Sequence, residues 1–159
     1  ALGFMATHPE CGLLTPGVYW ADGARQYLCK RMPTLFDLLL RGFAPKVLKR
    51  LFADRLANYE MRDQIGDDVV WDPPIVSGCF MLFRGEVLRR LKGFDPRFFL
   101  YFEDFDLSLR AANLTRVAYV PFVRIVHHGG DAARKGWSHV RMFGRSAIMF
   151  FTIHGWKFW

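Results

Sequence analysis

The chain has 159 residues, a length that fits one domain with a single sizeable core. Hydrophobic residues make up 52% of it and charged residues 23%, which excludes a disordered or low-complexity chain. The 22 Lys and Arg outnumber the 15 acidic residues, and the net charge of +7 favours an anionic partner such as a phosphate, a nucleotide or a lipid headgroup.

The three cysteines, Cys11, Cys29 and Cys79, are widely spaced and form no Cys-x-x-Cys pair. Neither a disulfide framework nor a zinc site is therefore indicated, and reduced thiols in a cytosolic protein are expected. No run approaches the ~20 apolar residues that span a bilayer. The first ten residues do not have the pattern of a signal peptide and begin inside an expected helix. We therefore expect a fragment of a longer protein.

The first third of the chain contains two expected helices and one strand. Residues 1–9 end a helix, residues 12–20 form a strand interrupted by a turn, and Ala-Asp-Gly at 21–23 is a turn signal. A second helix begins after its cap, Thr34, and ends at Gly42.

The middle of the chain begins with residues 43–70, which we interpret as a variable, mobile excursion. Residues 75–83 form a nearly continuous apolar run of strand length, which is typical of a strand buried on both faces. A short helix ended by Gly93, an acid-rich helix over 103–113 and a strand over 117–128 follow.

Apolar residues at helical spacing predict an amphipathic C-terminal helix at about 137–153. Alternating strands and helices predict an α/β fold over the whole chain, 1–159. The C-terminal stretch 137–159 combines aromatic and basic side chains, so we expect peripheral contact with an anionic membrane. The alternative is a helix packed on the rest of the protein.

The most informative segment is a cluster of three acids, Glu103, Asp104 and Asp106, among five Phe and Tyr residues. Carboxylates at a helix N-terminus interact well with the helix dipole, and Asp106 would pair with Arg110 one turn later. That purely structural interpretation stays open. However, carboxylates crowded among aromatic rings are costly unless a cation or a substrate uses them.

The order of motifs around this cluster resembles the C-terminal half of family 2 glycosyltransferases, especially the bacterial rhamnosyltransferase-like group. That group has a small-residue pair, then Gly-Phe-Asp, an aromatic run, the pattern E-D-x-D-L-x-x-R and a strand ending in His. The matching positions are Ser77, Gly78, Gly93, Phe94, Asp95, Glu103, Asp104, Asp106, Leu107, Arg110 and His127. The resemblance covers nearly the whole chain except about 43–70.

The resemblance implies the C-terminal, acceptor-side part of a GT-A α/β/α sandwich with a mixed sheet. It implies an inverting enzyme that moves a sugar from a nucleotide-diphosphate donor, rhamnose-like, to a hydroxyl of a saccharide or lipid-linked acceptor in cell-surface polysaccharide synthesis. A divalent metal, Mg²⁺ or Mn²⁺, would be the cofactor of the complete enzyme. The family's aspartate-x-aspartate metal motif precedes the matched region, so this chain alone is expected to be inactive.

The resemblance also assigns roles within the acid cluster. Asp104 would be the base that takes the proton of the acceptor hydroxyl, a task for which a carboxylate within hydrogen-bond reach is suited. Glu103 would orient the acceptor. Asp106 and Arg110 would form a structural pair that holds the helix.

Further site residues come from neighbouring segments. Ser77 and Gly78, on the expected central strand, would lie beneath the acceptor, where small residues permit close approach. Tyr101 would stack on a sugar or fill the core. His127 matches a family position whose imidazole helps bind the metal, although a structural histidine is the alternative. The family's H-x-x-G-x-S pattern, which begins at His127, has Ala132 in place of its Ser.

A non-catalytic, basic and aromatic module for anionic membrane or nucleic acid is the alternative function. The aromatic residues cluster with carboxylates, which repel phosphate, and no RRM, KH or helix-turn-helix pattern occurs, so we expect no nucleic acid. A cytoplasmic location, peripheral on the inner face of the cell membrane, is expected. So is self-association through apolar surface left by missing strands, at residues such as Leu13, Val76, Phe80 and Val120.

Overall fold

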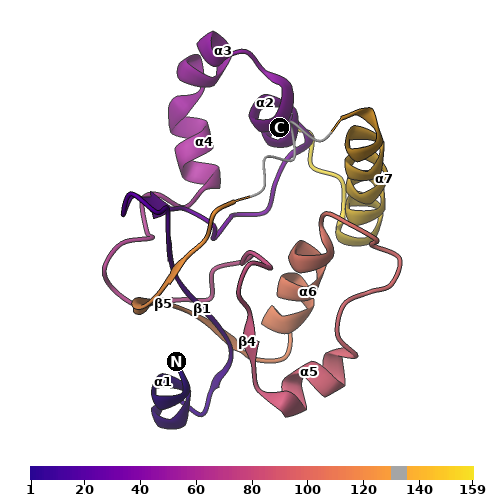
Figure 1. Ribbon diagram of the computed structural model, residues 1–159. Coiled ribbons are helices and arrows are strands. Elements are labelled where there is room, and N and C mark those ends of the chain that lie inside the picture. The colour runs from indigo at the N-terminus through magenta and orange to yellow at the C-terminus, as the bar shows by residue number, and fades with distance from the viewer. Residues whose placement is uncertain (130–135) are drawn as a thin grey trace.

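Two adjacent parallel strands, β1 (Cys11–Tyr19) and β5 (Arg116–Val126), form the centre of the fold. The computed structural model describes residues 1–129 and 136–159 (Figure 1). All of β1 except Tyr19 is buried, which explains why its sequence is nearly all apolar. The predicted interruption of this strand is wrong. The strand continues through Pro16 and Gly17. The register with β5 shifts there, because Pro16 is aligned with Val120 and Gly17 with Arg124, so that β5 contains extra residues at this point.

Three two-residue strands complete a mixed sheet. β2 (Arg25–Gln26) and β4 (Leu82–Phe83) pair antiparallel with β1, and β3 (Val70–Trp71) pairs antiparallel with β5. The order along the main path is β2-β1-β5-β3. The predicted α/β class and mixed sheet are thus confirmed.

Seven helices surround the sheet in the described part of the chain. They are α1 (Leu2–Thr7), α2 (Leu35–Phe43), α3 (Lys46–Leu51), α4 (Ala53–Tyr59), α5 (Gly85–Leu91), α6 (Glu103–Ala112) and α7 (Trp137–His154). In Figure 1, α2, α3 and α4 lie at one end of the molecule with the C-terminus, and α1 and α5 lie at the opposite end. None of these helices combines the length and apolar character needed to cross a bilayer.

Local sequence signals account for several helix ends. Thr34 caps α2 as predicted: its hydroxyl accepts from the Asp37 N–H, and the Asp37 carboxylate accepts from the Thr34 N–H. The helix runs one residue beyond Gly42. After α5, Lys92 and Gly93 both adopt left-handed conformations that end the helix.

Two predictions for the middle of the chain need correction. The segment 43–70 contains α3 and α4, which were not predicted. The predicted buried strand at 75–83 does not form. Ile75 makes an isolated bridge with Lys30, a turn follows at residues 78–79, and pairing resumes only in β4. Ser77 and Gly78 therefore lie at a turn and not on a central strand.

The buried apolar residues form three clusters. One lies between the sheet and helices α5 and α6 and includes Leu13, Val76 and Val117. A second joins α2, α6 and α7 around Phe102, Phe150 and Phe151. The third lies against α1 and includes Met5, Leu14 and Val120. The expectation that Leu13, Val76 and Val120 form exposed apolar surface is wrong, because all three are fully buried.

Candidate functional site

The turn at Gly78 is held against the first turn of α6. The Gly78 N–H donates to Asp104 Oδ2 over 2.8 Å. Ser108 accepts from the Val76 N–H at 3.1 Å and its hydroxyl donates to the Asp104 carbonyl at 2.6 Å. The bonds to Gly78 and Val76 join the turn to α6, and the Gly78 N–H orients the Asp104 carboxylate.

The absence of a side chain at Gly78 permits this approach. A Cβ at position 78 would lie 3.2 Å from Asp104 Cβ and 3.5 Å from its Oδ2. The first contact is tighter than most Cβ contacts, so Asp104 would have to shift by a few tenths of an ångström, whereas the second is an ordinary van der Waals contact. The small residue at position 78 thus permits the close approach of Asp104, and it lies in a turn and not on the predicted strand.

The backbone immediately before α6 is strained. Tyr101 and Phe102 have φ values of 70° and 65°, in the left-handed region that non-glycine residues rarely occupy. Phe102 is buried against Phe105, Phe143 and Phe150, so packing maintains the unfavourable conformation. Strain of this kind costs about 1–3 kcal/mol per residue and is concentrated at functional sites.

Electrostatics make Asp104 a candidate base. Burial raises the pKa of Asp104, the neighbouring Glu103 charge adds to the increase, and the bonds from the N–H groups of Gly78 and Phe105 oppose it; the resulting pKa is about 6, against an ordinary value of 3.8. A carboxylate with a pKa near 6 is largely ionised at neutral pH and accepts a proton more readily than an ordinary Asp.

Asp104 lines a cavity of about 600 Å³. Helix α6 and the residues before it contribute Tyr101, Glu103 and Asp104, and the turn contributes Ser77. The cavity thus brings together four of the predicted site residues. Helices α2 and α3 and the segment before them add three cations, Lys30, Arg41 and Lys49.

Two buried polar atoms at this cavity have no hydrogen-bond partner among the described residues. They are Glu103 Oε2 and the Tyr59 hydroxyl. Buried polar groups are normally paired, so these two unpaired atoms beside the cavity are exceptional. The Tyr101 hydroxyl, in contrast, lies 3.0 Å from His139 Nδ1 on α7. The Tyr101 ring packs edge-on against Phe143, which favours the core alternative for this residue.

Lys30 is the most buried cation of the cavity. Its side chain is 4% exposed, and its Nζ lies 3.4 Å from Glu60 Oε1 and donates to the Tyr27 carbonyl. Burial lowers the pKa of Lys30, the nearby Arg41 charge adds to the decrease and Glu60 opposes it, and the resulting pKa is about 8. Arg41 Nε also lies 3.9 Å from Glu60 Oε1, so Lys30 and Arg41 share one carboxylate on this side of the cavity.

Asp106 does not line the cavity and has a structural environment. Arg110 Nε lies 2.7 Å from its Oδ2, and the Arg110 guanidinium also donates to the carbonyls of Leu91 and Gly93 at the end of α5. The expected i,i+4 ion pair is present, and it links two helices.

His127 lies directly after β5, outside the set of residues that line the cavity. Its Nδ1 lies 3.4 Å from Gln26 Oε1, and Gln26 Nε2 donates to its carbonyl at 2.5 Å. Within residues 1–129 and 136–159, no three His, Cys, Asp or Glu side chains gather as a metal site. The donor set around His127 thus does not fit a metal by itself. Ala132 lies outside the described residues.

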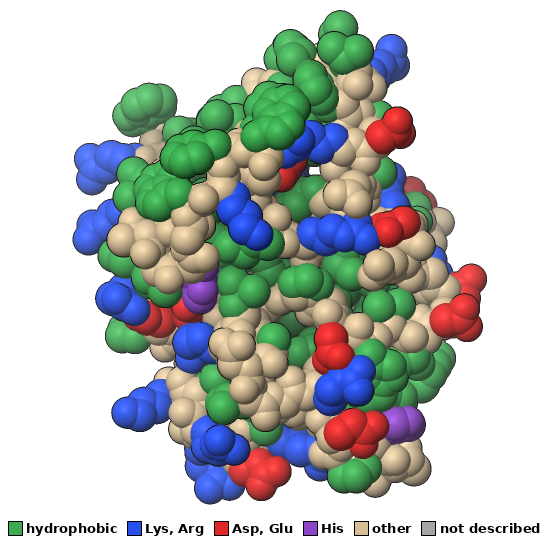
Figure 2. All heavy atoms as spheres, turned by 180° about the vertical axis from the view of Figure 1, so that it is seen from behind, with side chains coloured by type: hydrophobic (Ala, Val, Ile, Leu, Met, Phe, Trp, Pro, Cys, Tyr) green, Lys and Arg blue, Asp and Glu red, His purple; other side chains and the backbone are tan. Residues whose placement is uncertain are grey.

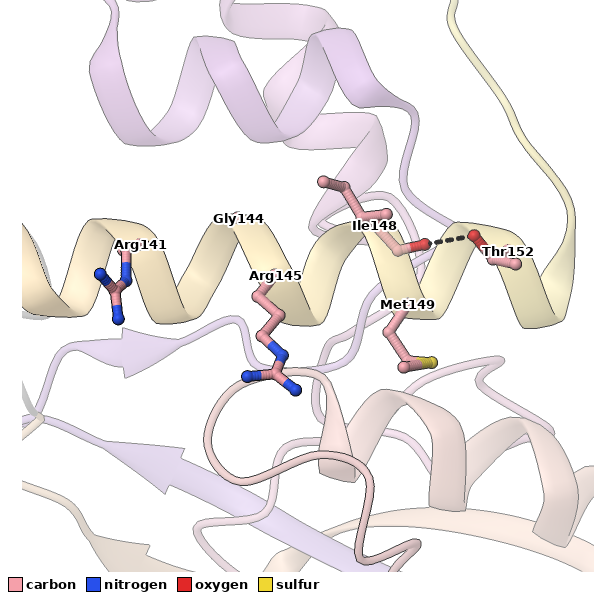
Figure 3. A pocket seen from close by; sticks show the side chains of 6 residues that line it. All are labelled: Arg141, Gly144, Arg145, Ile148, Met149 and Thr152. Atoms are coloured by element: carbon pink, nitrogen blue, oxygen red, sulfur yellow. Dashed lines mark hydrogen bonds between the residues drawn. The ribbon is translucent and has the colours of Figure 1, made fainter.

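A second hollow, of about 560 Å³, follows one side of α7 (Figure 3). It is lined by a single helix, with Arg145 and Met149 pointing the same way and Ile148 pointing away from them. None of the predicted site residues contributes to it.

Sequence reasoning missed four residues at the site: Lys30, Arg41, Lys49 and Ser108. The three basic residues come from segments without a recognisable motif. They line one cavity with residues of α6 only because of the tertiary fold, which the sequence does not show. Ser108 had a signal, because it follows Asp104 by one helical turn and a serine there can bond the carbonyl four residues back.

Comparisons with known proteins indicate the kind of protein to which this chain is related. The chain is similar to curated rhamnosyltransferases. It is 38% identical over 119 residues to rhamnosyltransferase WbbL of Escherichia coli, which covers 74% of the chain and 41% of that protein. It is 27% identical over 144 residues to N-acetylglucosaminyl-diphospho-decaprenol L-rhamnosyltransferase of Mycobacterium tuberculosis, which covers 89% of the chain and 46% of that protein.

The chain therefore spans less than half the length of these rhamnosyltransferases. No family model matches the chain, and no solved structure matches it. The similarity thus indicates a glycosyltransferase-like chain, and its finer assignment depends on the site.

Proposed function

We propose that this chain is the acceptor-side part of an inverting, family 2-like GT-A glycosyltransferase, with Asp104 as the base. The observation that carries the proposal is the oriented Asp104 carboxylate, with a pKa of about 6, at the edge of a 600 Å³ cavity. The similarity to proteins named rhamnosyltransferases supports rhamnose as the sugar and a nucleotide diphosphate as its carrier.

In the proposed reaction, Asp104 takes the proton of an acceptor hydroxyl. The hydroxyl oxygen forms a bond to the anomeric carbon on the face opposite the leaving group, and the nucleoside diphosphate departs with the electron pair of the broken bond. The Gly78 N–H holds the carboxylate in place during this step. Glu103 Oε2, unpartnered among the described residues, accepts a second acceptor hydroxyl and orients the sugar.

The cations of the cavity suit an acceptor that carries phosphate. Lys30, Arg41 and Lys49 lie on the same cavity as the base, and charge-assisted bonds to phosphate oxygens are among the stronger hydrogen bonds in proteins. The relative from M. tuberculosis is named for an N-acetylglucosaminyl-diphospho-decaprenol acceptor. We infer a saccharide linked through phosphate to a lipid, used in cell-surface polysaccharide synthesis at the cytoplasmic face of the membrane.

A divalent metal in the complete enzyme stays a prediction. His127 would supply one imidazole, and the residues around it do not add the further ligands that a metal site needs. No step above therefore depends on a metal. If His127 is a ligand, His127→Ala in the complete enzyme should shift the metal titration of activity, and an unchanged titration would assign it a structural role.

The test is transfer of rhamnose from its nucleotide diphosphate to a lipid-diphosphate-linked N-acetylglucosamine by the complete enzyme. Asp104→Asn should lower turnover by roughly 10²- to 10⁴-fold, the usual contribution of a general base, with donor affinity retained. Asp68→Asn, at an exposed carboxylate, is the matched control. Near-normal turnover by Asp104→Asn would remove Asp104 from the mechanism. Residues 1–159 alone should be inactive.

A further inference from the structure

Helices α2 and α3 present five exposed apolar side chains. Leu39 is 51% exposed, Phe43 58%, Val47 77%, Leu48 41% and Leu51 77%. Burying an apolar side chain of this size contributes about 1.5–3 kcal/mol, so leaving five of them in water is costly. Two of the five lie on α2 and three on α3.

The charges between these side chains all have one sign. Arg41, Lys46, Lys49 and Arg50 lie among them, and no acidic residue occurs between Asp37 and Asp54. Lys46 and Arg50 are exposed. We call this combination the α2–α3 surface, defined by Leu39, Arg41, Phe43, Lys46, Val47, Leu48, Lys49, Arg50 and Leu51.

The C-terminal tail extends the α2–α3 surface. The N–H groups of Leu35 and Phe36, at the start of α2, donate to the carbonyls of Lys157 and Phe158 at 2.8 and 3.3 Å. Phe158 is 65% exposed and Trp159 72%. Figure 2 shows hydrophobic side chains, with Lys and Arg beside them, gathered at the end of the molecule where Figure 1 places α3 and the C-terminus.

We propose that the α2–α3 surface docks on an anionic lipid bilayer. Exposed apolar tips flanked by cations fit the boundary between acyl chains and acidic headgroups, and Trp and Phe favour that depth. A nucleic acid would use aromatic stacking, whereas four of the five exposed apolar residues of α2 and α3 are aliphatic. The membrane contact expected for residues 137–159 is thus extended to α2 and α3: Phe158 and Trp159 are exposed beside this surface, whereas Phe150 and Phe151 of α7 are buried in the core.

Docking in this way would bring the cavity to the membrane. Arg41, Gly42 and Lys49 line the cavity and belong to, or directly adjoin, the α2–α3 surface. A phosphate-linked sugar on a lipid would therefore enter beside its own bilayer. This consequence depends on the proposed function, but the docking itself does not.

The experiment is flotation of the purified protein with two kinds of vesicle, neutral phosphatidylcholine alone and the same lipid with phosphatidylglycerol. We expect the protein to float with the anionic vesicles and to be released by salt, because exposed charges are screened. Lys46→Glu with Arg50→Glu should weaken vesicle affinity at least about 20-fold, given the contribution of each cation near the surface. Val47→Ser with Leu51→Ser should weaken it about tenfold or more.

Matched controls come from the opposite end of the molecule. Arg89→Glu with Arg90→Glu reverses two exposed charges on α5, and Leu2→Ser replaces a side chain that is 77% exposed on α1. Both should float like the unmodified protein. Failure of the unmodified protein to float, equal flotation with neutral vesicles, or equal losses in the α5 and α2–α3 variants would each overturn the proposal. Loss of flotation with transfer retained on a short, water-soluble acceptor would support docking and keep the proposed function.

Discussion

His154 Nε2 lies 2.9 Å from Asp106 Oδ1, so the last turn of α7 is tied to the first turn of the helix that carries Asp104. The other oxygen of the same carboxylate binds Arg110, which reaches the end of α5. Three helices thus meet at one carboxylate whose side chain is 2% exposed.

The first prediction concerns this junction. Asp106→Ala should lower the free energy of unfolding by about 3–5 kcal/mol, because it leaves the Arg110 and His154 side chains without their buried partner. Urea unfolding followed by circular dichroism measures the change. Asp95→Ala, which breaks the Arg97 pair nearer the surface, should cost less than about 1 kcal/mol. Equal effects of the two substitutions would contradict a structural role specific to Asp106.

The second prediction is that Asp104→Asn stabilises the protein near neutral pH. Because the pKa of Asp104 is about 6 in the folded protein, against an ordinary value of 3.8 for the unfolded chain, the folded state binds more protons between these values. The stability contributed by this group is therefore present below pH 3.8 and lost as the pH rises through 6. Asn does not titrate, so the variant should gain on the order of 2 kcal/mol at about pH 7.5 and almost nothing at about pH 4.

Urea unfolding at both pH values measures this difference, with Asp68→Asn as the control that should change at neither. A gain in stability together with a loss of turnover is the combination expected at a catalytic carboxylate. A loss of stability at neutral pH would mean that the ionised Asp104 carboxylate stabilises the folded protein, and would argue for a structural role and against proton transfer.

The third prediction concerns Gly78. Gly78→Ala should lower turnover roughly tenfold or more, because the added methyl group would push the Asp104 carboxylate out of line, and small errors of position are costly in catalysis. Gly66→Ala is the control, since a Cβ there meets nothing within 4 Å and neither glycine has a positive φ. Steady-state kinetics of the complete enzyme decide the matter. Unaltered kinetics in Gly78→Ala would show that the carboxylate tolerates displacement.

The fourth prediction separates phosphate binding from chemistry. Arg41→Ala should raise the acceptor KM about tenfold with kcat nearly unchanged, as expected when one charge-assisted hydrogen bond of about 1.5–3 kcal/mol is lost from bound acceptor. A short-chain acceptor in solution excludes any contribution of the membrane, and Arg89→Ala controls for the loss of a surface charge. A fall in kcat at constant KM would instead indicate that Arg41 acts on the transition state.

Local patterns predicted the parts of the site that depend on neighbouring residues. Side-chain chemistry and periodicity over a few residues were enough to predict three features. These are the Thr34 cap, the helix after Phe102 and the strand before His127. The pairing of Asp106 with Arg110 follows from helical spacing alone. The part played by His154 could not be predicted, because it requires α7 to return against α6.

The error at residues 75–83 has a tertiary cause. A continuous apolar run indicates burial, but burial does not distinguish a strand from a turn packed into a core. Here Val76 is buried while the next residues turn, and the N–H of Gly78 bonds to Asp104 instead of a neighbouring strand. The cations of the cavity were missed for a similar reason, since Lys30 and Arg41 come together with Asp104 only through the packing of α2.

The parallel pairing of β1 with β5 has a consequence for synthesis. Leu13 and Val117 are aligned in the sheet but lie about 100 residues apart in the chain, so at ~5–20 residues per second β1 waits ~5–20 s for its principal partner. During that time β2 and β4 can each cover only two of its residues. On the ribosome, this apolar strand is therefore exposed to chaperones until β5 has been made. A nascent chain stalled before Arg116 should remain open to proteolysis at residues 11–19.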